Sequence, residues 1–580
     1  MLPVRLTWIV RSGLTAGLVV LLAACAPAAP PASGGPVVGS GAVSAPAAAP
    51  ARTLVMAIRV EPASVASKTL GSGGVTLTTT RRLFNVTLAM FDDQGLAVPY
   101  LAATLPRLDT PSWVVASDGR METTYQLMPN LVWHDGQPLT ASDFVFAWRV
   151  YATTELGVSG VVPFPQIEEV VAPDATTVLI RWRRAYAEAG VLNEGLPPLP
   201  RHLLESAFQG GGFEAFAGLP HWTREYVGAG PYRLDRWDPG SAIEAVAFDQ
   251  HVLGRAKIER IRIVFIGDPN AALANILGGD VHFSADDSIR FQQGLVLKRE
   301  WGPRAGGSVL AKPDLWRATY VQLRSDQMSP RVLADVRVRR ALAHAIDKTL
   351  LNEGLFEGDG IMADVPLIPP TASYFASVER AATKYPFDLR RSEQLLLESG
   401  LSRGGDGIWT SAADGRLNLD LKTNGSAQNE AELSILGADL RRAGFEVREN
   451  VVPPALAQDG QVRNSFPSLY TFSTPLGEEN LAGHNVRNTP RAENRWVGMN
   501  RGAWASPEFD QISDAFNSTL DVGQREQRVV DMIRIFSSEV PALSLHFNPI
   551  PMAHIAALTG PKLVAPEAAV AWNVHQWEFR

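Results

Sequence analysis

LNLDLKTNGSAQNEAELSILGADLRRAGFEV, residues 417–447, contains a strand, a helix and a second strand in succession. Apolar and polar residues alternate over 417–421, as they do in a half-buried strand. Four apolar residues then fall on one helical face: Leu433, Leu436, Leu440 and Ala443. Gly444 is placed to end that helix before a strand begins at 445. Two strands joined by a helix are expected to be parallel, so the stretch predicts a mixed α/β fold.

Other segments support this class. Residues 54–60, 177–182 and 261–266 are strand-like apolar runs, and 270–277 reads as a short helix that Asn270 could cap. A further helix is expected to start at Ser506-Pro507-Glu508, with Ser506 as its cap. Its buried face would hold three apolar residues: Phe509, Ile512 and Phe516. The chain has 580 residues, more than one hydrophobic core usually serves, so two or more lobes are expected.

Composition excludes several kinds of function. The net charge is −7 and no long basic run occurs, which argues against a nucleic-acid partner. Cys25 is the only cysteine, so the folded part is expected to have no disulfide, cysteine metal site or cysteine nucleophile. The ten histidines are scattered without zinc-site spacing, and no G-x-S-x-G elbow occurs. We therefore expect no metal, no cofactor and no enzymatic activity, with a secreted hydrolase as a weakly supported alternative.

The first 52 residues predict export and tethering. Arg5 and Arg11 are followed by an uncharged stretch over 12–24, the pattern of a signal peptide covering 1–24. Leu22-Ala23-Ala24-Cys25 resembles the lipobox of bacterial lipoproteins, which implies that Cys25 is lipidated. An ordinary signal peptide with an incidental cysteine is the alternative. Residues 25–52 are almost entirely Ala, Pro, Gly, Ser and Val after Cys25, so we expect a disordered linker with a reach of roughly 25–30 Å.

The segment WHDGQPLTASDFVFAW, residues 133–148, combines a turn with a helix start. Asp135-Gly136 marks the turn, and Thr140 with Asp143 has the form of a capping box before an apolar helix. Trp133 and Trp148 are assigned to the core. These features are structural, and none of them is catalytic.

The same segment resembles the W-x-D-G-x-P-[VL]-T-A-x-D-[VF] pattern of family 5 solute-binding proteins, the oligopeptide, dipeptide and nickel binders of ABC importers. GAGPY at 228–232 resembles that family's G-T-G-P-Y turn, with Ala229 where Thr is usual. Residues 335–347 resemble its D-x-R-V-R-x-A-L-x-x-A-I-D helix. The family pattern is also matched by Gly279-Asp280, by Pro200-Arg201-His202 and by the closing segment 572–577. Together they cover about 53–580 in the family's order.

The resemblance implies a two-lobed fold of the periplasmic-binding-protein type (type II, large peptide-binding class) with an extra inserted subdomain. Lobe one would consist of 53–88, 198–285 and 540–580. The inserted subdomain would be 89–197, and lobe two 286–539. Ligand binding between the lobes would close them, and a membrane permease would recognise the closed form.

The implied function is capture of a small ligand, a peptide above all, and its delivery to an ABC permease. The protein would be an extracytoplasmic monomer, lipid-anchored to the cytoplasmic membrane and on the periplasmic side in a diderm. Alternatives are a surface sensor or chaperone on the same fold, or a non-peptide ligand such as an oligosaccharide.

One part of the pattern is missing. Many peptide binders of the family carry a Trp and an Asp in a short segment of lobe two, where the Asp pairs with the ligand's ammonium. The comparable stretch here, 466–479, has neither residue. Glu478 or Glu479 could take the place of the Asp with a rearranged loop. Otherwise a less charged ligand, such as a sugar or modified peptide, would meet hydroxyls and aromatic faces.

Seven residues are candidates for ligand contact. Glu61 follows the first strand in lobe one. The other six belong to lobe two: Tyr470, Phe472, Ser473, Thr474, Arg495 and Trp496. For each of them, packing or a solvated loop is the competing interpretation.

Overall fold

The computed structural model describes residues 53–580 except 69, 71–76, 160–161, 454–455, 457–458 and 495. The expected signal peptide, Cys25 and the linker to residue 52 lie outside the described residues. Within the described part, no helix has the length and apolarity that crossing a bilayer requires.

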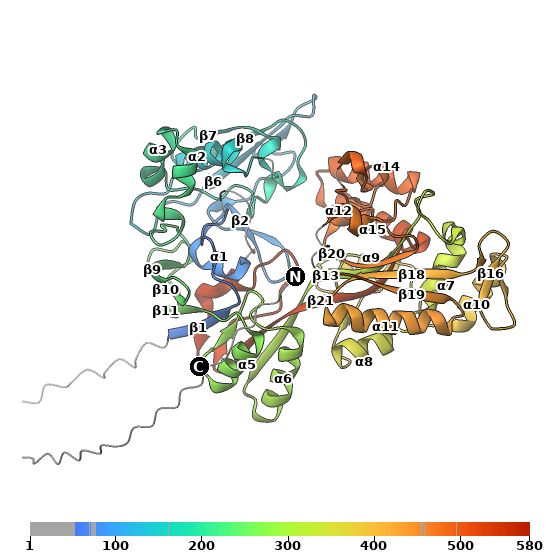
Figure 1. Ribbon diagram of the computed structural model, residues 1–580. Helices are drawn as coiled ribbons and strands as arrows, with labels where there is room; N and C mark the ends of the chain where they lie inside the picture. Colours follow the sequence, from blue (N-terminus) through green and yellow to red (C-terminus); the bar gives the residue numbers. More distant parts are fainter. Residues whose placement is uncertain are drawn as a thin grey trace, which may run out of the picture. The chain divides into compact units, whose positions relative to one another are not determined.

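One long mixed sheet runs through the fold (Figure 1). Its order is β19 (Glu446–Val452), β18 (Asn418–Asn424), β20 (Leu469–Pro475), β13 (Gly307–Val321), β21 (Ala542–Ile555), β12 (Phe283–Ser284), β1 (Thr53–Ile58), β11 (Arg260–Phe265), β10 (Ala242–Ala247) and β9 (Tyr232–Asp238). The short β14 (Ile361–Met362) also pairs with β21. The strands predicted at 54–60 and 261–266 are confirmed as β1 and β11, each displaced slightly toward the N-terminus.

The predicted strand–helix–strand unit is confirmed. β18 and β19 are parallel, and α11 (Ala427–Arg442) joins them. Leu433, Leu436 and Leu440 are buried against the sheet. The chain leaves the helix through Gly444 at φ +96°, a backbone conformation that favours glycine. Ser426 caps the start of α11 by accepting a hydrogen bond from the Asn429 backbone N–H.

A second sheet lies between residues 102 and 182. It has the order β4 (Ala102–Thr104), β6 (Met121–Leu127), β8 (Thr177–Trp182) and β7 (Ile167–Val171), with β5 (Trp113–Val115) beside β6. The helix α2 (Ala141–Ala152) begins with the predicted capping box of Thr140 and Asp143. Trp133 is buried, whereas Trp148 is only half-buried at the edge of the same apolar cluster.

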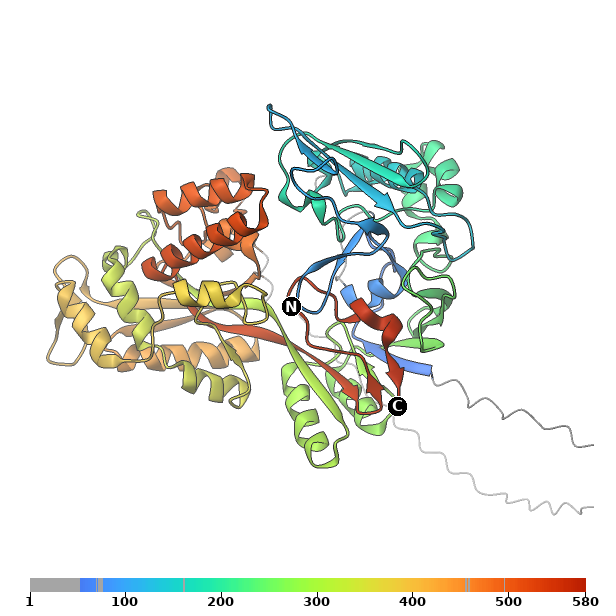
Figure 2. The ribbon, with the colours of Figure 1, turned by 180° about the vertical axis from the view of Figure 1, so that it is seen from behind.

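Two long strands, β13 and β21, connect the two ends of the main sheet. Seen from behind in Figure 2, they run side by side as the yellow-green and red strands. The first part of β13 pairs only with β21, whereas its last part also pairs with β20. The ladder is irregular at Asp314, between Pro313 and Leu315, and Pro313 faces Pro549. Proline has no N–H to donate, so backbone pairing is weakest at this midpoint.

Separate apolar cores form on the two sides of this midpoint. One contains Leu54 of β1 together with Trp133 and Trp577, so the C-terminal segment packs with the first strand. Another contains Trp316 and Phe536, together with residues of α14 (Pro507–Ser518) and α15 (Val522–Glu539). The helix α6 (Phe291–Trp301) contributes Leu297 and Trp301 to a small cluster with Ala57 of β1.

Two helix starts differ from the sequence prediction. α5 (Pro269–Gly278) is capped by Asp268, not by Asn270, because the Asp268 carboxylate accepts from the Ala271 N–H at 2.8 Å. α14 begins after Ser506 as predicted, but the Ser506 hydroxyl donates to Glu539 at 3.2 Å instead of capping its own helix. Phe509 and Phe516 are buried in α14, and Ile512 is partly buried.

The remaining elements surround these sheets. The helices are α1 (Thr78–Phe84), α3 (Arg201–Gln209), α4 (Phe213–Ala217), α7 (Val336–Ala345), α8 (Lys348–Phe356), α9 (Phe375–Ala381), α10 (Leu389–Glu398), α12 (Gly460–Asn464) and α13 (Glu478–Ala482). The small strands are β2 (Ala89–Phe91), β3 (Ala97–Pro99), β15 (Ser402–Arg403), β16 (Trp409–Ser411), β17 (Gly415–Arg416), β22 (Leu558–Thr559) and β23 (Glu578–Phe579).

Candidate ligand-binding cleft

A cavity of about 640 Å³ lies over the irregular midpoint of β13, and we refer to it as the cleft. It is lined by Phe91, 95–97, 187–188, Val191, 312–314, 373–374, 476–480, Val522, 525–526 and 566–567. Its volume is within the range of roughly 300–1,000 Å³ that small-molecule sites occupy.

The lining comes from two groups of segments. The first wall, formed by Phe91, 95–97, 187–188, Val191 and 566–567, adjoins the apolar core of Trp133 and Trp577. The second wall, formed by 373–374, 476–480, Val522 and 525–526, adjoins the core of Trp316 and Phe536. Lys312, Pro313 and Asp314 form the floor where β13 passes from one core to the other. A ligand in the cleft would therefore contact both halves of the sheet.

The cleft is strongly acidic. Two cations line it, Lys312 and Arg525, against six carboxylates: Glu188, Asp314, Glu478, Glu479, Glu526 and Glu567. The lining thus has a formal excess of four negative charges. The carboxylates occur on both walls and on the floor.

Contacts within the protein satisfy some of these charged groups. Arg525 Nη2 lies 3.6 Å from Glu478 Oε2. Lys312 Nζ donates to the backbone carbonyls of Pro566 at 3.1 Å and Ala568 at 2.9 Å, which ties the floor to the first wall. Tyr186 donates to Glu188 at 2.8 Å.

Burial raises the pKa of four of these carboxyl groups: Asp314, Glu478, Glu479 and Glu567. For Glu479 the charge of Glu188, which belongs to the other wall, adds to the increase in pKa. For Glu478 the charge of Arg525 opposes it. The nearby cations therefore do not fully compensate the loss of solvation.

Residues 103–475 match the family model for bacterial extracellular solute-binding proteins, family 5 Middle. The chain belongs to this family. The oligopeptide-binding protein AppA of Bacillus subtilis is 24% identical over 383 residues, which is 64% of this chain and 66% of that relative, just under two thirds of its length. A putative peptide-binding protein of an ABC transporter in Brucella ovis is 24% identical over 418 residues, covering 70% and 73% of the two chains.

Solved structures show the same fold. AppA of Bacillus subtilis in complex with a nonapeptide matches with a TM-score of 0.61 and 19% identity, over 91% of this chain and 99% of that one. NikZ of Campylobacter jejuni in complex with Ni(L-His) matches with a TM-score of 0.64 and 21% identity, over 91% and 100%. These structures confirm the expected fold class, and the family model confirms the expected family.

The candidate from the first strand has structural partners. Glu61 accepts hydrogen bonds from Trp237 Nε1 at 2.7 Å and from the Gly240 N–H at 2.9 Å. These contacts hold the end of β1 to the β9–β10 turn. Glu61 is not among the residues that line the cleft.

The candidates on β20 lie within the strand ladder beside β13. Tyr470 and Thr474 are buried, and Thr474 is hydrogen-bonded to the Tyr320 hydroxyl at 2.5 Å. Phe472 contacts the guanidinium groups of Arg463 and Arg501, at 4.7 and 4.0 Å from the ring centre. Ser473 accepts from Asn548 at 3.2 Å. None of these four residues is among those that line the cleft, so their contact with ligand stays a prediction.

The last two candidates lie further along the chain. Arg495 is outside the described residues. Trp496 is half-buried, and the Arg324 guanidinium lies 5.7 Å from its ring centre at an open surface hollow separate from the cleft.

Sequence reasoning identified Glu478 and Glu479 only as possible replacements for the missing Asp. The structure shows that both line the cleft at the start of α13, immediately after β20. The other carboxylates of the cleft were missed. They come from 188, 314, 526 and 567, which no sequence motif brings together.

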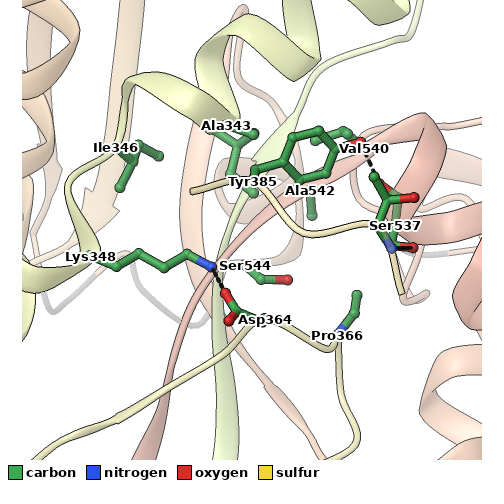
Figure 3. A pocket seen from close by; sticks show the side chains of 12 residues that line it. Ala343, Ile346, Lys348, Asp364, Pro366, Tyr385, Ser537, Val540, Ala542 and Ser544 are labelled. Carbon is green, nitrogen blue, oxygen red and sulfur yellow. Dashed lines mark hydrogen bonds and ion pairs between the residues drawn. The ribbon is translucent and has the colours of Figure 1, made fainter. Parts of the chain in front are cut away.

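A much smaller cavity, of about 30 Å³, lies between α8, α15 and β21 (Figure 3). Lys348 extends into it and donates to Asp364 at 2.8 Å and to the Ala363 carbonyl at 2.8 Å. This volume holds about two water molecules and no larger solute. Burial lowers the pKa of Lys348, and its two acceptors satisfy the ammonium, so we assign the contact to packing. Among the described residues, no group of three His, Cys, Asp or Glu side chains could hold a metal ion.

Proposed function

We propose that this solute-binding protein captures a peptide in the cleft and delivers it to an ABC permease, releasing it chemically unchanged. The observation that supports this most directly is a cavity of about 640 Å³ whose walls belong to separate apolar cores. The peptide class is supported by the relatives' names. The permease partner follows from the family's role.

We propose that the midpoint of β13 and β21 is the hinge. Few backbone hydrogen bonds can form where Pro313 faces Pro549, and the Asp314 irregularity loosens the ladder further. A small change in φ and ψ there would move one wall toward the other, because each wall is fixed to its own core. Closure would bury the ligand, and the permease would bind the closed form.

The sequence predicts lobe one as 53–88, 198–285 and 540–580, the inserted subdomain as 89–197 and lobe two as 286–539. The proposed hinge moves two of these bounds, so that 286–312 joins lobe one and 540–548 joins lobe two. The packing of Leu297 and Trp301 against Ala57 favours placing the first crossing within β13, after residue 306. For the N-terminus we propose cleavage before Cys25, lipidation of Cys25 and a monomer tethered outside the cytoplasmic membrane. Lipobox-like residues 22–25 and the Ala/Pro-rich linker support this.

Native mass spectrometry of the purified protein with a mixed pool of tri- to hexapeptides tests the function. We expect bound peptide at a ratio of one per chain and an increase in thermal stability, since a ligand bound only by the folded state stabilises it. No bound species and no thermal shift with any pool would refute the proposal. Incubation for a day should leave the peptide masses unchanged, and cleaved peptide would contradict the proposed release without chemistry.

A further inference from the structure

We propose that the ligand of the cleft carries at least two positive charges on aliphatic stems, as a peptide with lysine or arginine side chains does. This inference rests on the proposed function, because it takes the cleft as the ligand site. It adds the charge of the ligand, which the family assignment leaves open.

Carboxylates lie on every side of the cleft. Glu188 and Glu567 lie on the first wall, Glu479 and Glu526 lie on the second, and Asp314 lies on the floor between them. Glu188 and Glu479 already interact across the cleft, where Glu188 raises the pKa of Glu479, and closure would bring the other carboxylates of the two walls nearer to one another. At an effective dielectric constant of 20, two like charges at 4 Å repel by about 4 kcal/mol, so an empty or neutral cleft resists closure.

The two cations of the cleft already have partners within the protein. Lys312 directs its ammonium to two carbonyl oxygens of the first wall. Arg525 forms one ion pair among the described residues, with Glu478 at 3.6 Å. Among the described residues of the lining, no cation lies within ion-pair distance of Glu479, Glu526 or Glu567. The charges of Arg525 and Lys312 lower the pKa of Glu479 and Glu567 from a longer distance, but burial outweighs them. A cationic ligand could therefore still neutralise these carboxylates.

The cleft also presents apolar surface beside its carboxylates. Both walls also contribute apolar side chains to the lining: Phe91, Leu96, Val191, Leu476 and Val522. Leu96 and Val522 are 55% and 69% exposed, so they offer apolar surface to a solute. Lysine and arginine bury their methylene stems along such surface while their charged ends reach carboxylates. A sugar has no comparable apolar stem or charge.

Isothermal titration with three pentapeptides of the same length tests the inference. They are Ala-Lys-Ala-Lys-Ala, the same peptide with both lysines acetylated, and Ala-Glu-Ala-Glu-Ala. We expect the lysine peptide to bind at least about tenfold more tightly than its acetylated form, a difference of about 1.4 kcal/mol, and to weaken with added salt. Spermidine is titrated in parallel, because a free polyamine offers the same chemistry without a peptide backbone.

The variant Glu479→Gln/Glu526→Gln should lose most of this preference. Its control is Glu155→Gln, an exposed residue that does not line the cleft, for which we expect an unchanged preference. Equal affinity for the lysine and acetylated peptides would overturn the inference and leave the proposed function standing. Absence of binding by all ligands, including mixed peptide pools, would overturn both. Tighter binding of spermidine than of the lysine peptide would support the charge requirement and overturn the assignment to peptides.

Discussion

Arg525 Nη2 lies 3.6 Å from Glu478 Oε2, and both side chains line the cleft from the second wall. Arg525 comes from the first turn of α15 and Glu478 from the first turn of α13. Arg525 is the one guanidinium among the described residues of the lining. The pair therefore limits how negative the second wall becomes, and it links the start of two helices whose packing shapes that wall.

Replacing Arg525 by Gln should change stability and affinity in opposite directions. The loss of the cation leaves Glu478 without its partner, so thermal unfolding of the empty protein should occur at a lower temperature. The more negative cleft should bind the lysine pentapeptide more tightly, by about two- to tenfold. Calorimetry and titration on the same preparation check both effects. Weaker binding of the lysine peptide would show that Arg525 itself holds the ligand.

Glu479→Gln should stabilise the empty protein at neutral pH. Burial raises the pKa of Glu479, and the charges of Glu188 and Glu478 raise it further. The charge of Arg525 opposes this increase. The charge of Glu479 in turn raises the pKa of Tyr186. The folded state therefore binds a proton more readily than the unfolded chain, and ionisation costs stability above the folded pKa. The cost disappears as pH falls below the ordinary value of 4.5.

The expected gain for Glu479→Gln is below about 1 kcal/mol, because solvent in the open cleft reaches the side chain and screens its charge, although the surrounding walls remove part of its hydration. Urea unfolding at pH 7.5 and pH 4 measures it. A gain of the same size at both pH values would contradict the electrostatic explanation. Binding of the lysine peptide should weaken over the same acidic range, as the carboxylates become protonated.

Glu432→Gln should destabilise the fold beside the hinge strands. Glu432 accepts from Arg317 Nε of β13 at 2.8 Å and contacts His546 Nε2 of β21 at 2.9 Å, and all three residues are buried. Burial alone would raise the pKa of Glu432, but the charges of Arg317 and His546 outweigh it and lower the pKa to about 2. Breaking such a buried pair costs about 3–5 kcal/mol.

Glu430→Gln is the matched control on the exposed side of α11 and should cost less than about 1 kcal/mol. In the unmodified protein, the contribution of Glu432 is present above the ordinary pKa of 4.5 and is lost as pH falls toward 2. Urea unfolding between pH 7 and pH 3 should show this dependence in the control and less of it in Glu432→Gln. Equal stability of the two variants would contradict the assigned role.

Thr474→Val distinguishes a structural from a ligand-binding role for β20. The substitution keeps the shape of the side chain and removes its hydrogen bond with Tyr320, so we expect a loss of about 1 kcal/mol in stability. Peptide affinity should be unchanged, because Thr474 is buried away from the cleft lining. An affinity loss larger than tenfold would restore Thr474 as a ligand contact.

The fold could be predicted where the sequence shows strand alternation, an apolar helical face or a helix cap. The alternation at 417–421 and the helical face of Leu433, Leu436 and Leu440 predict β18 and α11, and Thr140 with Asp143 predicts the start of α2. The predicted cap of α5, Asn270, was wrong, because the backbone path places Asp268 at the position where a side chain can accept from the Ala271 N–H.

The cleft was much less predictable. Its carboxylates are brought together by the pairing of β13 with β21 and by the C-terminal segment returning to the first core, which are long-range contacts without a local signal. The candidates on β20 belong to the stretch in which many peptide binders of the family carry the Trp and the Asp. The structure places the charged lining immediately after that strand, at Glu478 and Glu479, because the chain turns into α13 there.

Closure on ligand can be measured directly by a distance between the two walls. Gln94, in the turn between β2 and β3, and Gln524, in the first turn of α15, are exposed and do not line the cleft. Nitroxide labels at Gln94→Cys and Gln524→Cys, in a Cys25→Ser background, allow pulsed electron double resonance with and without the lysine pentapeptide. The account predicts a shorter distance with bound peptide and little change with its acetylated form. An unchanged distance at saturation, confirmed by titration of the labelled protein, would contradict ligand-driven closure of the cleft.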